Sequence, residues 1–152
     1  IAAPGSKKGA AFGDVNLDGQ MDIVVSHLGR EGPAWFEFDG DPADPSAWRK
    51  RRTNSPGGKS DLVKLYDVDQ DGDLDIFAAS QTDSRIIWFE NDGFQNFTTH
   101  NINSSLSWPS ALAFADNDND GDIDIICSFR FLFCRDALAG RLYKFLCPQR
   151  AI

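Results

Sequence analysis

The stretch Asp67-Val-Asp-Gln-Asp-Gly-Asp-Leu-Asp75 decides how the whole chain is interpreted, because one further copy of it occurs on each side. These copies are Asp14-Val-Asn-Leu-Asp-Gly-Gln-Met-Asp22 and Asp116-Asn-Asp-Asn-Asp-Gly-Asp-Ile-Asp124. We call them loops 1, 2 and 3 in chain order. Every copy has an oxygen-bearing side chain at positions 1, 3, 5 and 9 and a glycine at position 6, so we expect one structure and one role for all three.

This spacing predicts a calcium site in each loop, up to three in all. Calcium takes about six to eight oxygen ligands, and a glycine at position 6 permits the sharp turn that wraps them around the ion. Magnesium prefers fewer protein ligands, and zinc prefers the His and Cys that the loops lack. A solvated Asp/Asn/Gly turn is the alternative. Three copies argue against it, since converging like charges repel each other unless a cation neutralises them.

The loops match an EF-hand over their first nine positions and then diverge from it. An EF-hand needs a bidentate Glu at position 12 and a helix on each side. Position 12 is Val25, Ala78 or Cys127 here. Each loop is followed by a short apolar run, such as Ile76-Phe-Ala78, which is typical of a buried strand. The sequence therefore predicts calcium loops between strands.

The repeat extends well beyond the loops. Trp35-Phe-Glu-Phe-Asp-Gly40 matches Trp88-Phe-Glu-Asn-Asp-Gly93 at an offset of 53, whereas Trp48 matches Phe97 at an offset of 49. Repeat 1 thus carries four extra residues in the proline-rich stretch after Gly40, as expected of a surface loop. No segment has useful helical periodicity, and each repeat is interpreted as four short strands. The predicted first strands are residues 9–13, 61–66 and 110–115, and the predicted fourth strands are residues 48–53 and 97–102.

Repeats of about 40 to 50 residues with four strands are typical of β-propeller blades. We predict an all-β fold, a β-propeller fragment of about three four-stranded blades with the third incomplete. The expected boundaries are about 9–54 for blade 1, about 60–103 for blade 2 and about 109–128 for the partial blade 3, within residues 1–128. Three blades do not close a ring, since propellers have typically four to eight. We therefore expect further blades in a longer parent chain.

The pattern of acidic loop, apolar strand, Ile-x-Trp-Phe-Glu-Asn-x-Gly and Phe-Thr-x-His resembles the FG-GAP/VCBS repeat, the blade unit of integrin α-subunit-like propellers. The resemblance covers about residues 9–128 and is most complete in repeat 2. It implies calcium in the loop that joins the first two strands of a blade. The implied side-chain ligands are Asp14, Asn16, Asp18, Asp22, Asp67, Asp69, Asp71, Asp75, Asp116, Asp118, Asp120 and Asp124. Gln20, Asp73 and Asp122 would contribute backbone carbonyls.

Residues 129–152 depart from the repeat and form an atypical basic and aromatic tail. Counting 13 residues from Asp124, as from Asp22 to Trp35, ends at Ala137 rather than at a Trp. The tail has five basic residues and one acid, Asp136. One interpretation is a surface that contacts a partner or a membrane face. The interpretation that we favour is that this segment is not blade sequence.

The aromatic residues suggest two different roles. Trp35 and Trp88 occupy equivalent repeat positions, so we expect them to pack inside the blades. Trp48 and Trp108 lie nearer the loops and are the candidate ligand-binding residues, because indole faces stack well on sugar rings.

The net charge of −8 comes largely from the loops, and three calcium ions would neutralise most of it. Nucleic acid is therefore an unfavourable partner, and no apolar run is long enough to span a membrane. Cytosolic calcium is low, so an extracellular or cell-surface location is expected. The predicted function is non-catalytic, in adhesion or in recognition of a protein or glycan ligand. The alternative is a carbohydrate-binding, lectin-like module or an accessory domain of a polysaccharide-active enzyme.

Overall fold

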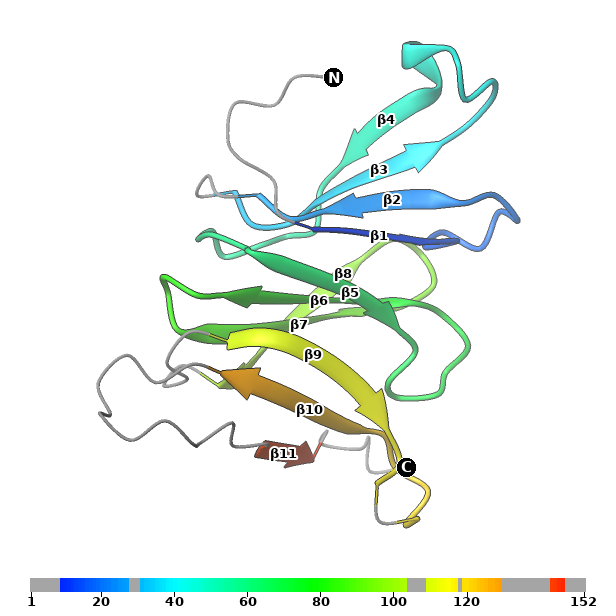
Figure 1. Cartoon of the computed structure of the whole chain (residues 1–152). Helices are drawn as coiled ribbons and strands as arrows, with labels where there is room; N and C mark the ends of the chain where they lie inside the picture. The colour runs from blue at the N-terminus through cyan, green and yellow to red at the C-terminus, as the bar shows by residue number, and fades with distance from the viewer. Residues whose placement is uncertain (1–8, 28–30, 104–108, 118, 130–142, 147–152) are drawn as a thin grey trace.

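The computed structural model describes residues 9–27, 31–103, 109–117, 119–129 and 143–146, which form three antiparallel sheets side by side (Figure 1). The first sheet has the order β1-β2-β3-β4 and the second has the order β5-β6-β7-β8, so strands adjacent in the sequence are adjacent in the sheet. The array is open. This arrangement confirms the predicted all-β fold of a propeller fragment, and the described residues include no α-helix.

The strand bounds are close to those expected from the repeat. The first sheet consists of β1 (Ala10–Gly13), β2 (Asp22–Val25), β3 (Ala34–Phe38) and β4 (Trp48–Arg51). The second consists of β5 (Leu62–Tyr66), β6 (Asp75–Ser80), β7 (Arg85–Asn91) and β8 (Phe97–Asn103). The insertion in repeat 1 leads into a short 3-10 turn, η1 (Pro45–Ala47), whose N-cap Asp44 accepts a hydrogen bond from the backbone N–H of Ser46 at 2.8 Å. No helix in the described part of the chain is long and apolar enough to cross a membrane.

The third sheet has the order β11-β10-β9 and extends past residue 128. It contains β9 (Pro109–Ala115), β10 (Asp124–Phe129) and β11 (Tyr143–Leu146). β11 pairs antiparallel with β10, with Ile125 opposite Phe145. With three strands among the described residues, where the other sheets have four, this sheet agrees with the predicted incomplete third blade. β11 lies in the segment 129–152, for which no strand was predicted. The unpaired backbone groups along one edge of β10 provide a template for any strand that reaches them, so pairing does not require the Trp-Phe-Glu motif.

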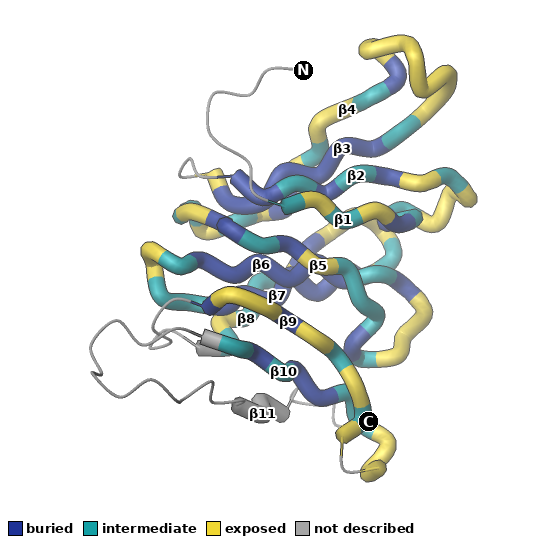
Figure 2. Tube along the Cα trace, viewed as in Figure 1, coloured by how far each residue is buried: buried dark blue, intermediate teal, exposed yellow. Residues whose placement is uncertain are grey.

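The hydrophobic core lies between the sheets in two clusters (Figure 2). Successive side chains of a strand point to opposite faces, so the central sheet contributes to both clusters. Ile76 and Phe89 belong to the cluster shared with the first sheet, whereas Phe77 and Trp88 belong to the cluster shared with the third sheet. Trp35 is also fully buried, which confirms the predicted core role of the equivalent tryptophans.

Candidate metal centre

Each acidic loop joins the first and second strands of a sheet, and all three loops have the same backbone conformation at positions 4 and 6. Position 4 is left-handed in every copy, with φ of 61° at Leu17, 59° at Gln70 and 57° at Asn119. The glycine at position 6 also has positive φ, 100° at Gly72 in loop 2. A Cβ at Gly72 would meet no atom within 4 Å, so glycine is favoured there by its conformation and not by lack of space. The loops thus fold alike despite their different side chains.

Backbone N–H groups hold the position 1 carboxylate inside each loop. In loop 2, Asp67 accepts hydrogen bonds from the backbone N–H groups of Asp71 and Gly72, both at 3.1 Å. Asp71 in turn accepts one from the N–H of Asp73 at 3.3 Å. The N–H groups of positions 5, 6 and 7 donate the same bonds in the other two loops. The donors are Asp18, Gly19 and Gln20 in loop 1 and Asp120, Gly121 and Asp122 in loop 3. These bonds orient the carboxylates of positions 1 and 5 before any ligand arrives.

In the first two sheets, the position 9 carboxylate links the loop to the third strand by hydrogen bonds. Asp75 is fully buried, and its two oxygens accept hydrogen bonds from the backbone N–H groups of Val68 at 3.3 Å and Asn91 at 2.9 Å. Burial raises the pKa of Asp75 to about 7, although these two hydrogen bonds oppose the shift. Asp22 makes the corresponding bonds with Val15 and Phe38 and also accepts one from the indole of Trp35. In loop 3, buried Asp124 accepts a hydrogen bond from the N–H of Asn117 at 3.1 Å.

Loop 2 brings three carboxylates together. Asp67, Asp69 and Asp71 each offer one oxygen, and these oxygens all lie within 4.8 Å of one another. Both oxygens of Asp69 and one oxygen of Asp73 are buried and have no hydrogen-bond partner among the described residues. Burial, together with the charge of Asp71, raises the pKa of Asp69 and raises that of Asp73 to about 6. Because uncompensated buried oxygens are costly, the donor set of loop 2 fits a hard cation.

Loop 1 has a different set of contacts at the same positions. Asn16 replaces the aspartate of position 3, and its side-chain amide donates to Asp18 at 2.9 Å and to Glu37 at 3.1 Å. The amide therefore supplies donors to two carboxylates that a cation would otherwise neutralise. In loop 3, Asp118 at position 3 lies outside the described residues.

The structure identifies Glu37 and Glu90, one from each Trp-Phe-Glu motif, as carboxylates of these sites that the sequence analysis missed. Glu37 accepts the bond from Asn16, and the charge of Glu90 contributes to the raised pKa of Asp69. Each also contacts its fourth strand. Arg51 lies 2.6 Å from Glu37, and the ring of His100 lies 2.6 Å from Glu90. A glutamate repeated inside an otherwise apolar strand is the signal that could have revealed them.

Asn91, which follows Glu90, connects the loops of the first and second sheets. Its buried side-chain amide donates to the backbone carbonyls of Val15 at 2.8 Å and Leu74 at 3.2 Å. One residue therefore holds position 2 of loop 1 beside position 8 of loop 2. The geometry of the two loops is coupled through this contact.

Of the two tryptophans predicted to bind a ligand, the structure describes Trp48 but not Trp108. Trp48 is partly buried and packs against Phe38, with the ring centroids 4.8 Å apart. Its indole N–H donates to the carbonyl of Pro42 at 3.5 Å, so Trp48 stabilises the insertion of repeat 1. Trp108 lies outside the described residues.

Comparison with protein-family models gives a match to the FG-GAP-like repeat over residues 67–127, from the start of loop 2 to the second strand of the third sheet. A search of curated proteins found no match. The matched segment contains loops 2 and 3 in full, strands β6 to β9 and the first part of β10, but not β5, the strand before loop 2. Over residues 67–127, the chain is therefore similar to the FG-GAP-like repeat family.

Proposed function

We propose that this chain is a calcium-binding, non-catalytic module of the β-propeller type that recognises a protein or glycan ligand outside the cell. The observation that carries the proposal is the cluster of Asp67, Asp69 and Asp71, in which the buried oxygens of Asp69 accept no hydrogen bond from the described part of the chain. Removing charge from water is costly unless a counter-charge is supplied. A bound divalent cation supplies that charge.

Calcium suits this cluster better than other common ions. Its flexible coordination accepts several carboxylates and a backbone carbonyl within one loop. In loop 2, Asp67, Asp69 and Asp71 would hold the ion through their side chains, with the carbonyl of Asp73 and the carboxylate of Asp75 as further donors. Asp75 retains a structural role in either case, because its oxygens also bond the backbone of Val68 and Asn91.

A non-catalytic role is supported by the surroundings of His100. Its ring contacts Glu90 and stacks on Trp88, with the ring centroids 4.5 Å apart. These contacts hold β7 and β8 together within the second sheet. An extracellular setting is supported by the calcium concentration that such a site needs. Extracellular modules bind calcium with dissociation constants of order 10⁻⁴ to 10⁻³ M, well above the free calcium of the cytosol.

Thermal unfolding with excess calcium and with a chelator tests the proposal. A cation present at about 100 times its dissociation constant adds about 2.7 kcal/mol per site. For a chain of this size, about 1 kcal/mol corresponds to a Tm change of about 2–4 °C. We therefore expect a Tm several degrees higher in calcium than in chelator, and a smaller increase in magnesium. Identical melting curves in calcium and chelator would contradict the proposal.

A carbohydrate-binding module is the second candidate function. It is favoured by a polar groove, distinct from the acidic loops, that lies beside the fourth strand of the first sheet. The absence of glycan binding would leave the calcium proposal unaffected, because the groove contains none of the loop 2 carboxylates that carry that proposal.

A further inference from the structure

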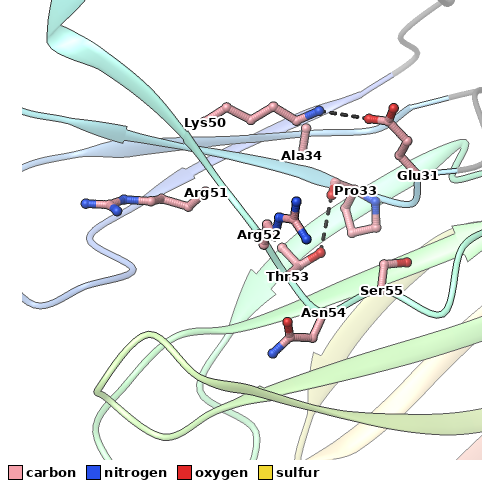
Figure 3. Close-up of a pocket in the computed structure, with 9 residues that line it drawn as sticks. All are labelled: Glu31, Pro33, Ala34, Lys50, Arg51, Arg52, Thr53, Asn54 and Ser55. Carbon is pink, nitrogen blue, oxygen red and sulfur yellow. Dashed lines mark hydrogen bonds and ion pairs between the residues drawn. The ribbon is translucent and has the colours of Figure 1, made fainter.

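A run of four consecutive cations, Arg49-Lys-Arg-Arg52, forms most of β4 and the residue after it in a chain whose net charge is −8. Side chains alternate between the two faces of a strand, so these cations divide into two pairs. Arg49 pairs with Asp39, the residue after β3, at 3.3 Å. Arg51 pairs with Glu37 on β3 at 2.6 Å. In Figure 3 the side chain of Arg51 extends away from those of Lys50 and Arg52.

Lys50 and Arg52 line a cavity of about 750 Å³ (Figure 3). Arg51 also lines it, but its guanidinium is paired with Glu37. Pro33 and Ala34, both buried, line it too, and Asn54 and Ser55 add polar groups. The cavity therefore combines cations, neutral hydrogen-bonding groups and a small apolar surface.

A second hollow of about 370 Å³ shares four lining residues with the first: Lys50, Arg51, Arg52 and Asn54. It also contains Gln95 and Asn96, which lie between β7 and β8 of the second sheet. Together the two hollows form a groove between the first and second sheets. Two adjoining hollows of this size have room for more than a single small ion, and they suit a ligand with several linked units.

The positive charge in this groove is available to a ligand. The pair between Lys50 and Glu31, 2.8 Å apart, is exposed, with 49% and 68% of the two side chains accessible. Exposed pairs contribute little stability, so a ligand can displace Glu31 from Lys50 at small cost. Arg52 makes no hydrogen bond or ion pair with the described residues. Its guanidinium retains the planar set of donors that binds carboxylate and sulfate groups in a bidentate manner.

We propose that the groove between β4 and the β7–β8 turn binds the oxyanion groups, carboxylate or sulfate, of an anionic glycan chain. Arg52 and Lys50 bind the oxyanions, and the side-chain amides of Asn54, Gln95 and Asn96 bind sugar hydroxyls. Duplex nucleic acid is disfavoured, because the rest of the molecule would repel its phosphates. This inference rests on the recognition role proposed above and specifies its ligand class, and it does not involve the calcium loops.

Isothermal titration calorimetry in calcium tests the inference with three oligosaccharides of equal length: one of uronate, one sulfated and one neutral. We expect binding of at least one anionic oligosaccharide, weakened by added salt, and no binding of the neutral one. The two anionic arms distinguish carboxylate from sulfate as the preferred group. Binding of the neutral oligosaccharide with equal affinity would overturn the proposal, as would tighter binding of a DNA duplex or no binding of either anionic oligosaccharide.

Two matched variants separate a specific site from general charge attraction. Arg52→Gln and Arg49→Gln remove the same charge from the same run, but only Arg52 lines the groove. We expect Arg52→Gln to weaken binding about tenfold, because charge-assisted hydrogen bonds to the oxyanion are lost. Arg49→Gln should change affinity by less than about twofold, since exposed charges act weakly at a distance. Equal losses in the two variants would overturn the assignment.

A gain-of-affinity variant adds a second test. Among the described residues that line the groove, Glu31 is the one that is acidic, and Glu31→Gln removes its charge and frees Lys50. Binding of the anionic oligosaccharide should tighten, whereas unchanged or weaker binding would count against the proposal. Calcium titration of Arg52→Gln then separates the two hypotheses, because calcium affinity should equal that of the wild-type chain.

Discussion

Loops 1 and 2 have similar backbone conformations but differ in how their acidic groups are neutralised. In loop 1, the Asn16 amide donates to Asp18 and Glu37, and Arg51 neutralises Glu37 from the neighbouring strand. In loop 2, Asp69 takes the place of Asn16, and its buried oxygens accept no hydrogen bond from the described residues. The two loops therefore differ in their need for a counter-charge. We attribute that need in loop 2 to the aspartate at position 3.

The glutamates of the third strands, Glu37 on β3 and Glu90 on β7, also differ in how their charge is neutralised. Glu37 is paired with an arginine, which is always charged, whereas Glu90 contacts a histidine and adds its own charge to the surroundings of Asp69. Blade 1 therefore contains its own counter-charges. Blade 2 combines more carboxylates with fewer fixed cations, so it is the blade that we expect to respond to calcium.

The largest expected effect concerns the feature that the two loops have in common. Asp22→Ala and Asp75→Ala each remove a buried carboxylate and leave backbone N–H groups without an acceptor, at a cost of about 1–3 kcal/mol for each unsatisfied group. In chelator, both variants should melt at clearly lower temperature than the wild-type chain, and by similar amounts. If only one of them is destabilised, position 9 does not have the same structural role in both loops.

Exchanging position 3 between the loops should give smaller effects of opposite sign. In chelator, Asp69→Asn should stabilise the chain by about 1 kcal/mol, because it removes a buried charge beside Asp71. Asn16→Asp should destabilise by a similar amount, since it removes the amide donor and adds a negative charge near Glu37. Urea unfolding of the two variants provides the measurement. Two changes of the same sign would refute the contrast between the loops.

The pH dependence of the metal-free chain follows from the raised pKa values in loop 2. The pKa is about 7 for Asp75 and about 6 for Asp73, so each carboxyl holds its proton more strongly in the folded than in the unfolded chain. This contribution to stability is full below pH 4 and is lost as pH rises through 6 to 7. Melts in chelator should therefore show a Tm that falls between pH 5 and pH 8.

Saturating calcium should remove or reverse that trend, because the ion stabilises the ionised carboxylates. The groups with lowered pKa, Asp44, Asp92 and Glu31, titrate below this range and do not affect it. A Tm in chelator that rises steadily from pH 5 to pH 8 would show that burial does not control these carboxyls.

The smallest expected effect belongs to the pair between Arg51 and Glu37. Arg51→Gln removes a partly exposed ion pair, for which about 1 kcal/mol or less is expected. The loss should be greater in an Asn16→Ala background, where Glu37 has lost both partners. A double-mutant cycle in chelator measures this coupling, and strictly additive losses would argue that Asn16 and Arg51 do not act on the same carboxylate.

Much of the fold could be predicted from the sequence, because the repeat itself carries the signal. The offset between Trp35 and Trp88 placed the third strands, and the acidic loops placed the first and second strands on either side of them. β4 ends at Arg51, two residues earlier than expected. β11 could not be predicted, since Tyr143–Leu146 has no repeat motif and its position depends on the free edge of β10.

The candidate site was predictable only in part. The spacing identified the acidic side chains, and the family resemblance implied that each loop holds one ion. The sequence alone could not show that Asn16 contacts Glu37, because the two lie 21 residues apart and meet only after β2 and β3 have paired. Nor could it show that Arg52 and Lys50 line one groove with Gln95, since that groove forms between two sheets.

Calcium calorimetry on the full chain tests the central claim most directly, with Asp71→Ala in loop 2 compared with Asp18→Ala in loop 1. These residues occupy the same position and accept the same backbone hydrogen bond, so the variants are matched. We predict that wild-type calcium binding includes a tightest site that Asp71→Ala abolishes and Asp18→Ala leaves intact. The reverse result, with loop 1 as the tightest site, or no calcium binding by the wild-type chain, would contradict the account.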